Sequence, residues 1–145
     1  MGEEFNNPDS SQIKAILQQV KTIAVVGLSP KESRPSFQVA QHLQSYGYQI
    51  IPVRPAVDEV LGEKAFADLS DVIAKIDLVD VFRAPDKISP IIDYCIEHKI
   101  TYLWLQDGVI NHQEALRAQA AGVTVIMDRC IYRDYKELLI SNDES

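Results

Sequence analysis

Hydrophobic residues in this sequence follow two patterns, short continuous apolar runs and segments in which apolar residues recur every three or four positions. The apolar runs, rich in Val, Ile and Leu, occupy residues 23–26, 48–53, 60–66, 77–82, 101–105 and 123–127. Runs of this kind are typical of parallel strands buried on both faces. Helical spacing is found at residues 10–20, 35–46, 87–99, 111–122 and 131–140, with a short helix at 68–73. Because strands alternate with helices, the sequence predicts an α/β fold, a single doubly wound parallel sheet of Rossmann type with five to six strands.

Two strand orders agree with this pattern. The order we expect, numbered along the sequence, is 3-2-1-4-5 with a sixth strand at the edge, and residues 60–66 supply its third strand. The flavodoxin-like order 2-1-3-4-5 is the competing topology. Pro52 has no amide N–H, so its strand is expected to be near its end or to face a short neighbour. Residues 1–145 are predicted to form one domain, with loose ends at residues 1–7 and 141–145.

Composition and charge exclude several classes of protein. A formal net charge of −7 argues against a general surface for nucleic acid or anionic membranes, both of which need a basic face. The two cysteines, Cys95 and Cys130, are far apart and have no zinc-ligand spacing, as expected in a reducing compartment. No run approaches the roughly 18 apolar residues of a membrane span, and the acidic start does not resemble a signal peptide. We therefore expect a cytoplasmic protein.

The segment TIAVVGLSPKESRPSF (residues 22–37) has the strongest functional signal. A buried strand ends at Gly27, and a short polar loop then leads to Pro35, which is favoured at the first position of a helix. A helix N-terminus directs unpaired backbone N–H groups and the positive end of the helix dipole at one point. Lys31 and Arg34 add two positive charges there. The segment therefore predicts a site for a phosphorylated ligand.

Polar residues follow the other strands, and the carboxyl ends of parallel strands meet at one edge of a sheet. These residues are Arg54 and Pro55, then Arg83, Ala84 and Pro85, then Gln106, Asp107 and Gly108, and finally Arg129 and Cys130. Cations follow four of the strands in an acidic protein, which favours a binding edge. Two simpler interpretations stay open: Arg54 and Arg83 pair with Asp58 or Asp86, and Cys130 is a quiet core thiol.

The loop lacks the features of a standard NAD site, and this narrows the choice of phosphorylated ligand. A standard NAD site has G-x-G-x-x-G and an acidic residue about 20 positions further on. Here Leu28, Ser29 and Pro30 follow Gly27, and the second strand ends in Arg54. An arginine at that position suits a phosphate on the ribose, as in NADP or in the 3′-phosphate of coenzyme A (CoA).

Six stretches together resemble the small stand-alone CoA-binding proteins, whose fold is similar to the N-terminal domain of the succinyl-CoA synthetase α-subunit. The stretches are AVVGLSPKESRPSF (24–37), GYQIIPVRP (47–55), VLGE (60–63), VDVFR (79–83), LWLQDGV (103–109) and VIMDRC (125–130). The resemblance implies that CoA lies across the strand ends, with its diphosphate at the loop from Ser29 to Ser36. It also implies that Arg54 lies near the adenosine phosphate, where the family often has Asn, and that residues 83–85 line the pantetheine or phosphate side. Asp107 occupies a position that is often apolar in the family.

The leading hypothesis is a protein that binds CoA or an acyl-CoA and has no catalytic residue or metal of its own. The predicted binding residues are Gly27, Ser29, Pro30, Lys31, Arg34, Pro35, Ser36, Arg54, Arg83, Ala84, Pro85 and Gln106. One alternative is a small NADP-dependent reductase, and another is a subunit that supplies the CoA site to an acyl-CoA ligase partner. A third is a redox role in which Cys130 forms a mixed disulfide with CoA. A homo-oligomer is compatible with each of these hypotheses.

Overall fold

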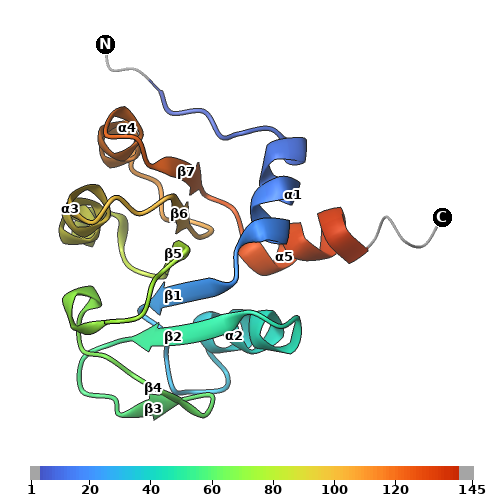
Figure 1. Ribbon diagram of the computed structural model, residues 1–145, viewed down its shortest axis with the longest axis vertical. Coiled ribbons are helices and arrows are strands. Elements are labelled where there is room, and N and C mark those ends of the chain that lie inside the picture. Colours follow the sequence, from blue (N-terminus) through green and yellow to red (C-terminus); the bar gives the residue numbers. More distant parts are fainter. Residues whose placement is uncertain (1–3, 141–145) are drawn as a thin grey trace.

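The fold is built on a five-stranded parallel sheet. The computed structural model describes residues 4–140. Its sheet has the order β2-β1-β5-β6-β7, and every neighbouring pair is parallel (Figure 1). The strands are β1 (Thr22–Val26), β2 (Gln49–Val53), β5 (Leu78–Val81), β6 (Tyr102–Leu105) and β7 (Thr124–Met127). The predicted α/β fold with a parallel sheet is therefore confirmed.

Helices cover both faces of the sheet (Figure 1). On one side lie α1 (Ser10–Gln19), α2 (Pro35–Ser45) and α5 (Ile131–Tyr135), which continues into the π-helical turn η3 (Lys136–Ile140). On the other side lie α3 (Ser89–Glu97) and α4 (His112–Ala120). Two short 3-10 turns, η1 (Leu69–Asp71) and η2 (Pro85–Lys87), precede β5 and α3. None of the helices in the described part of the chain is long and apolar enough to cross a membrane.

The core is divided into two layers by the sheet, because side chains alternate between its faces. Ile23 and Val25 of β1 pack with α1 and α2, whereas Ala24 and Val26 face the layer that contains α3 and α4. Trp104 of β6 is fully buried in the first layer, and its indole N–H donates to the carbonyl of Arg129 (2.8 Å). Burial on both faces explains why the strands appear in the sequence as continuous apolar runs.

The prediction of a third sheet strand at residues 60–66, and with it the order 3-2-1-4-5, is wrong. The segment instead contains a small antiparallel hairpin of β3 (Glu59–Val60) and β4 (Glu63–Lys64). Leu61 and Gly62 have φ values of 56° and 77°. Positive φ at both central residues is the geometry of a two-residue hairpin turn, so the chain reverses there. Five strands remain in the competing order 2-1-3-4-5.

Beyond β2, the missing strand is reduced to a single bridge between Val53 and Phe66. The N–H of Phe66 donates to the carbonyl of Pro52 (2.9 Å), and the N–H of Arg54 donates to the carbonyl of Phe66 (2.8 Å). This short neighbour agrees with the prediction for Pro52, whose nitrogen has no hydrogen to donate to an adjacent strand.

The N-terminal segment is attached to the domain from residue 5 onward, so the predicted looseness through residue 7 is wrong there. Phe5 is buried, and its N–H donates to Nδ1 of His112 (2.9 Å). Asn7 exchanges two hydrogen bonds with the backbone of Met127, at 2.9 and 2.7 Å. Asp9 then caps α1 in a reciprocal arrangement with Gln12. The predicted loose ends at 1–3 and 141–145 lie outside the described residues.

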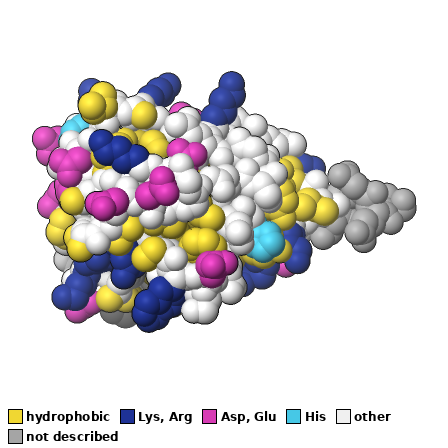
Figure 2. All heavy atoms as spheres, turned by 90° about the horizontal axis from the view of Figure 1, so that it is seen from below, with side chains coloured by type: hydrophobic (Ala, Val, Ile, Leu, Met, Phe, Trp, Pro, Cys, Tyr) yellow, Lys and Arg dark blue, Asp and Glu magenta, His cyan; other side chains and the backbone are white. Residues whose placement is uncertain are grey.

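The surface carries charges of both signs. On the face seen in Figure 2, Lys and Arg side chains lie in separate groups among acidic and hydrophobic side chains. A continuous basic surface, which binding to a nucleic acid backbone requires, is not present on that face.

Candidate functional site

Gly27, directly after β1, brings three strand ends together. Its φ is +87°, a conformation that L side chains rarely adopt. A Cβ at this position would lie 2.2 Å from the carbonyl oxygen of Phe82, which follows β5. On the other side, the N–H of Gly27 donates to the carbonyl of Val53 in β2 (2.8 Å). The loop after β1 therefore passes through a gap between β2 and β5 that has no room for a side chain.

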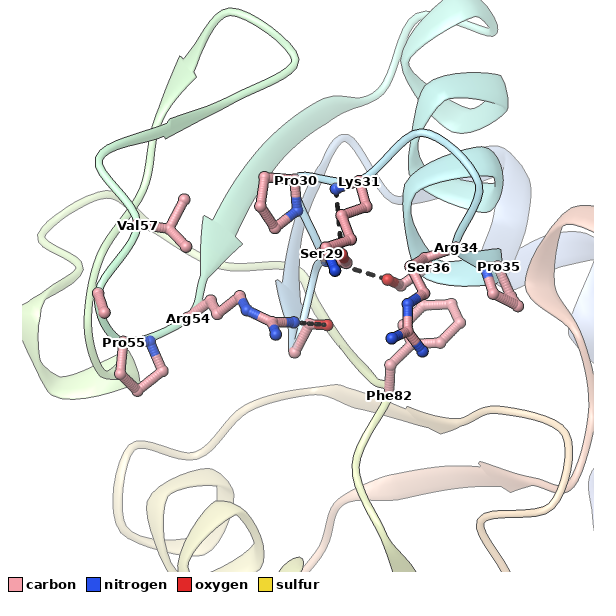
Figure 3. Close-up of a pocket in the computed structure, with 12 residues that line it drawn as sticks. Ser29, Pro30, Lys31, Arg34, Pro35, Ser36, Arg54, Pro55, Val57 and Phe82 are labelled. Carbon is pink, nitrogen blue, oxygen red and sulfur yellow. Dashed lines mark hydrogen bonds between the residues drawn. The ribbon is translucent and has the colours of Figure 1, made fainter.

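Two buried serines hold the loop against the start of α2 (Figure 3). The N–H of Ser29 donates to Oγ of Ser36 (3.0 Å), and the N–H of Lys31 donates to Oγ of Ser29 (3.1 Å). Both hydroxyl oxygens thus accept a bond from the loop backbone, and their own O–H groups can still donate to a ligand. No side chain caps the N-terminus of α2, so its first N–H groups are available as well.

Four cations surround this loop, and none of them forms an ion pair with an acidic residue of the described chain. Lys31, Arg34 and Arg83 are exposed, and Arg54 is half-buried. The ion pairs of the described residues involve Arg117, Arg129 and Arg133 instead. The alternative in which Arg54 and Arg83 pair with Asp58 or Asp86 is therefore not observed among residues 4–140.

The guanidinium of Arg54 is positioned over the loop. Its Nη1 donates to the carbonyl of Gly27 (3.3 Å). In Figure 3, Arg54 and Arg34 reach into the same space from two sides, below Lys31 and Pro30. Positive charges held apart in this way, beside an uncapped helix N-terminus, have the chemistry of a site for a phosphate or diphosphate.

This space is a cavity of about 600 Å³, which we call the loop cavity. It brings together eight of the predicted binding residues with four others. Its lining consists of Gly27, Ser29, Pro30, Lys31, Arg34, Pro35, Ser36, Arg54, Pro55, Ala56, Val57 and Phe82.

A second cavity of about 480 Å³, the strand-end cavity, adjoins the first. The two share Pro35 and Phe82, so they lie side by side along the carboxyl ends of the strands, and we call the pair the groove. The strand-end cavity is more apolar, and it includes three further predicted residues, Arg83, Ala84 and Gln106. Its lining consists of Pro35, Val39, Phe82, Arg83, Ala84, Gln106, Asp107, Val109 and Cys130.

Pro85 is the predicted binding residue that lines neither cavity. It begins η2, and its carbonyl accepts a hydrogen bond from Nδ2 of Asn111 (3.0 Å). This contact attaches the turn after β5 to the start of α4. The position of Pro85 in the turn therefore separates it from the groove, although Arg83 and Ala84 immediately before it line the groove.

Two arginines at the same edge of the sheet are engaged in ion pairs. Arg129, one of the cations expected at the strand ends, makes a two-point contact with the buried Asp134 (2.6 and 2.8 Å). Arg133 makes a similar contact with Asp107 (2.9 and 2.8 Å), and the hydrogen bonds from Arg133 lower the pKa of that carboxyl. Asp107, at the rim of the strand-end cavity, is thus neutralised by a neighbouring arginine.

The sequence did not single out Phe82, which both cavities share. The strand-end argument would have included it, because it is the first residue after β5. Ala56 and Val57 were also missed, since they carry no polar group. Ala56 has a φ of 62°, which turns the chain after Arg54 along the wall of the loop cavity.

Comparison with known proteins shows the family to which the chain belongs. A model of the CoA binding domain matches residues 21–136, a range that contains every residue of the groove. The chain belongs to the CoA binding domain family. The uncharacterized protein YneT of Bacillus subtilis (strain 168) is 42% identical over 127 residues, which are 88% of this chain and 94% of YneT.

Solved structures share the fold of this CoA binding domain over its whole length. Prb, a protein redesigned for binding, superposes with a TM-score of 0.91 at 33% identity, over 97% of this chain and 99% of that one. A hypothetical protein from Pyrococcus horikoshii OT3 gives a TM-score of 0.88 at 32% identity, over 95% and 99% of the two chains.

A part of this CoA binding domain is also related to a much larger enzyme. The ADP-forming acetate–CoA ligase of Methanocaldococcus jannaschii is 30% identical over 70 residues. These residues are 48% of this chain and 10% of the ligase, so the chain corresponds to a small portion of that protein.

Proposed function

We propose that the groove binds CoA or an acyl-CoA and that the chain acts as a binding protein without a catalytic group of its own. The phosphates occupy the loop cavity, where Lys31, Arg34 and Arg54 surround the open N-terminus of α2. The 3′-phosphate of the adenosine lies nearest Arg54, at the end of β2. The pantetheine arm passes Phe82 into the strand-end cavity, past Arg83.

The observation that carries this proposal is the distribution of unpaired positive charge. The chain has a net charge of −7. Among the described residues, three arginines form ion pairs, and the three that form none, Arg34, Arg54 and Arg83, all line the groove together with Lys31. Charged side chains without partners have little reason to gather beside a helix N-terminus, where a cation opposes the dipole. A bound polyphosphate makes cations favourable at this position, because each phosphate oxygen then accepts charge-assisted hydrogen bonds from them.

Apolar surface in the second half of the groove favours CoA over a purely polar nucleotide. Val39, Val109 and Phe82 line the strand-end cavity, and the pantetheine arm carries methyl and methylene groups that such a surface accommodates. NADP shares the ribose phosphate, but it lacks the pantetheine arm.

Titration calorimetry with CoA, dephospho-CoA and NADP tests the proposal. We expect CoA to bind more tightly than either of the others. Hydrogen bonds to charged groups contribute about 1.5–3 kcal/mol, so Arg34→Ala should weaken CoA about 10- to 100-fold. Arg54→Ala should weaken CoA by a similar factor and change dephospho-CoA much less, since that ligand lacks the 3′-phosphate.

Arg117→Ala is the matched control, because it removes the same charge from α4, outside the groove. Its affinity for CoA should equal that of the original protein. No heat with CoA at millimolar concentration would refute the proposal. Equal affinity for CoA and dephospho-CoA would refute the role of Arg54 alone.

A further inference from the structure

Cys130 places a thiol at the far end of the groove from the phosphate loop. It follows β7, is half-buried and lines the strand-end cavity. The other cysteine, Cys95, is fully buried in the layer of α3 and α4, and burial raises the pKa of its thiol to about 12. Cys95 is therefore an unreactive core residue, whereas Cys130 is open to a molecule in the groove.

Gln106, on the wall of the same cavity, independently indicates a ligand there. It is only 3% exposed, and its Oε1 accepts a hydrogen bond from the N–H of Ile131 (3.2 Å). Its Nε2 has no acceptor within the described part of the chain. Because Gln106 lines the cavity, this amide N–H group is available to a ligand there that carries a carbonyl oxygen. The pantetheine arm carries two amide carbonyls.

Next to Cys130 in the sequence, α5 carries Arg133, which contacts the cavity residue Asp107 through two hydrogen bonds (2.9 and 2.8 Å). This ion pair fixes the start of α5, and with it the position of Cys130, against the loop after β6. The thiolate is the form of a cysteine that attacks disulfides.

The length of the groove matches the length of the arm. From β1, which carries the phosphate loop, to β7, which carries Cys130, there are three strand spacings in the order β1-β5-β6-β7. At about 4.8 Å each, they span about 14 Å. The pantetheine arm has about as many backbone bonds as four extended amino acid residues, and therefore also reaches about 14 Å. A CoA with its diphosphate at the loop would bring its sulfur to the region of Cys130.

We propose that Cys130 exchanges with CoA disulfide in this groove, which makes it a site of reversible CoA attachment. This proposal rests on the proposed function. The Cys130 thiolate attacks one sulfur of CoA disulfide, the bond between the two CoA sulfurs breaks, and a bond between Cys130 and one CoA forms. The second CoA leaves as a thiolate and takes up the proton that Cys130 lost. No oxidant or reductant is consumed, because one disulfide replaces another.

Intact mass spectrometry of the reduced protein after incubation with CoA disulfide tests the exchange. We expect a mass gain of one CoA less two hydrogen atoms, located at Cys130 by peptide mapping. Because the phosphates hold the disulfide in the groove, the rate should exceed that with glutathione disulfide about tenfold or more. Adenosine 3′,5′-bisphosphate, which carries phosphates but no thiol, should slow the reaction with CoA disulfide.

Variants of the two cysteines complete the experiment. Cys130→Ser should abolish the adduct, and Cys95→Ala should retain it. Equal rates with CoA disulfide and glutathione disulfide would show only an accessible thiol and would overturn the inference. An absent adduct in a protein that binds CoA in calorimetry would also overturn it and leave the proposed function intact. An absent adduct without CoA binding would remove both.

Discussion

Gly27→Ala should destabilise the protein strongly and abolish CoA binding. The added methyl group would lie 2.2 Å from the Phe82 carbonyl oxygen, and at φ +87° it would also strain the backbone. Strain of this kind costs about 1–3 kcal/mol, and relieving the clash requires β1 and β5 to separate at their carboxyl ends. We expect the free energy of unfolding to fall by about 3 kcal/mol or more, measured by urea denaturation.

Gly62→Ala tests the effect of backbone strain without a steric clash. Gly62 also has a positive φ, +77°, but no atom lies within 4 Å of the position of its Cβ. This substitution in the β3–β4 turn should cost only about 1 kcal/mol and leave CoA affinity unchanged. If the two variants lost the same stability, the close packing of Gly27 against Phe82 would have no energetic consequence, and the loop would have room for a side chain.

The part of the site that the sequence predicted best is the part determined by local chemistry. A β-branched run, a glycine and a proline at the first helical position specify the turn after β1 and the start of α2. The rule that ligands bind at the carboxyl ends of parallel strands then brought distant residues such as Arg54 and Arg83 to one edge. In the structure, Arg54 lines the loop cavity and Arg83 lines the adjacent strand-end cavity.

The errors arose where a contact made only in the folded chain, or a backbone conformation that the residue rarely adopts, decides the outcome. Arg129 has the same position after its strand as Arg83, but the buried Asp134 binds it. The sequence near Phe5 is polar, and only the folded structure shows the apolar layer into which that ring packs. Leu61 has a positive φ in the observed turn, and leucine rarely adopts such a φ. Residue preferences therefore favour a strand at this position.

Asp80 is a buried acidic residue that lies outside the groove. It lies in the middle of the sheet, on β5, between Val25 of β1 and Trp104 of β6. Its side chain is fully buried, and neither carboxyl oxygen has a hydrogen-bond partner among residues 4–140. Burial raises its pKa well above the ordinary value of 3.8, and the nearby backbone of Val81 lowers it only in part. Asp80 is therefore expected to remain protonated in the folded protein when it is ionised in the unfolded chain.

Asp80→Asn should stabilise the protein increasingly as the pH rises above 4. Above the unfolded pKa, the unfolded chain releases a proton that the folded protein retains, so the original protein loses up to about 1.4 kcal/mol of stability per pH unit. This loss continues until the pH reaches the raised pKa of the folded state. The asparagine does not ionise, and below pH 4 both side chains are neutral, so the two proteins should then have similar stability.

Urea denaturation of both proteins at a series of pH values measures this difference directly. Contributions of all other titrating groups cancel when the two free energies of unfolding are subtracted, because only residue 80 differs. Asp71→Asn, which removes one exposed carboxylate from η1, is the matched control and should change the free energy of unfolding little. If the curve for Asp80→Asn ran parallel to that of the original protein between pH 4 and pH 7, Asp80 would have to be ionised in the fold. An ionised Asp80 would require a partner for its charge inside the central strand, because an isolated carboxylate is too costly to bury there.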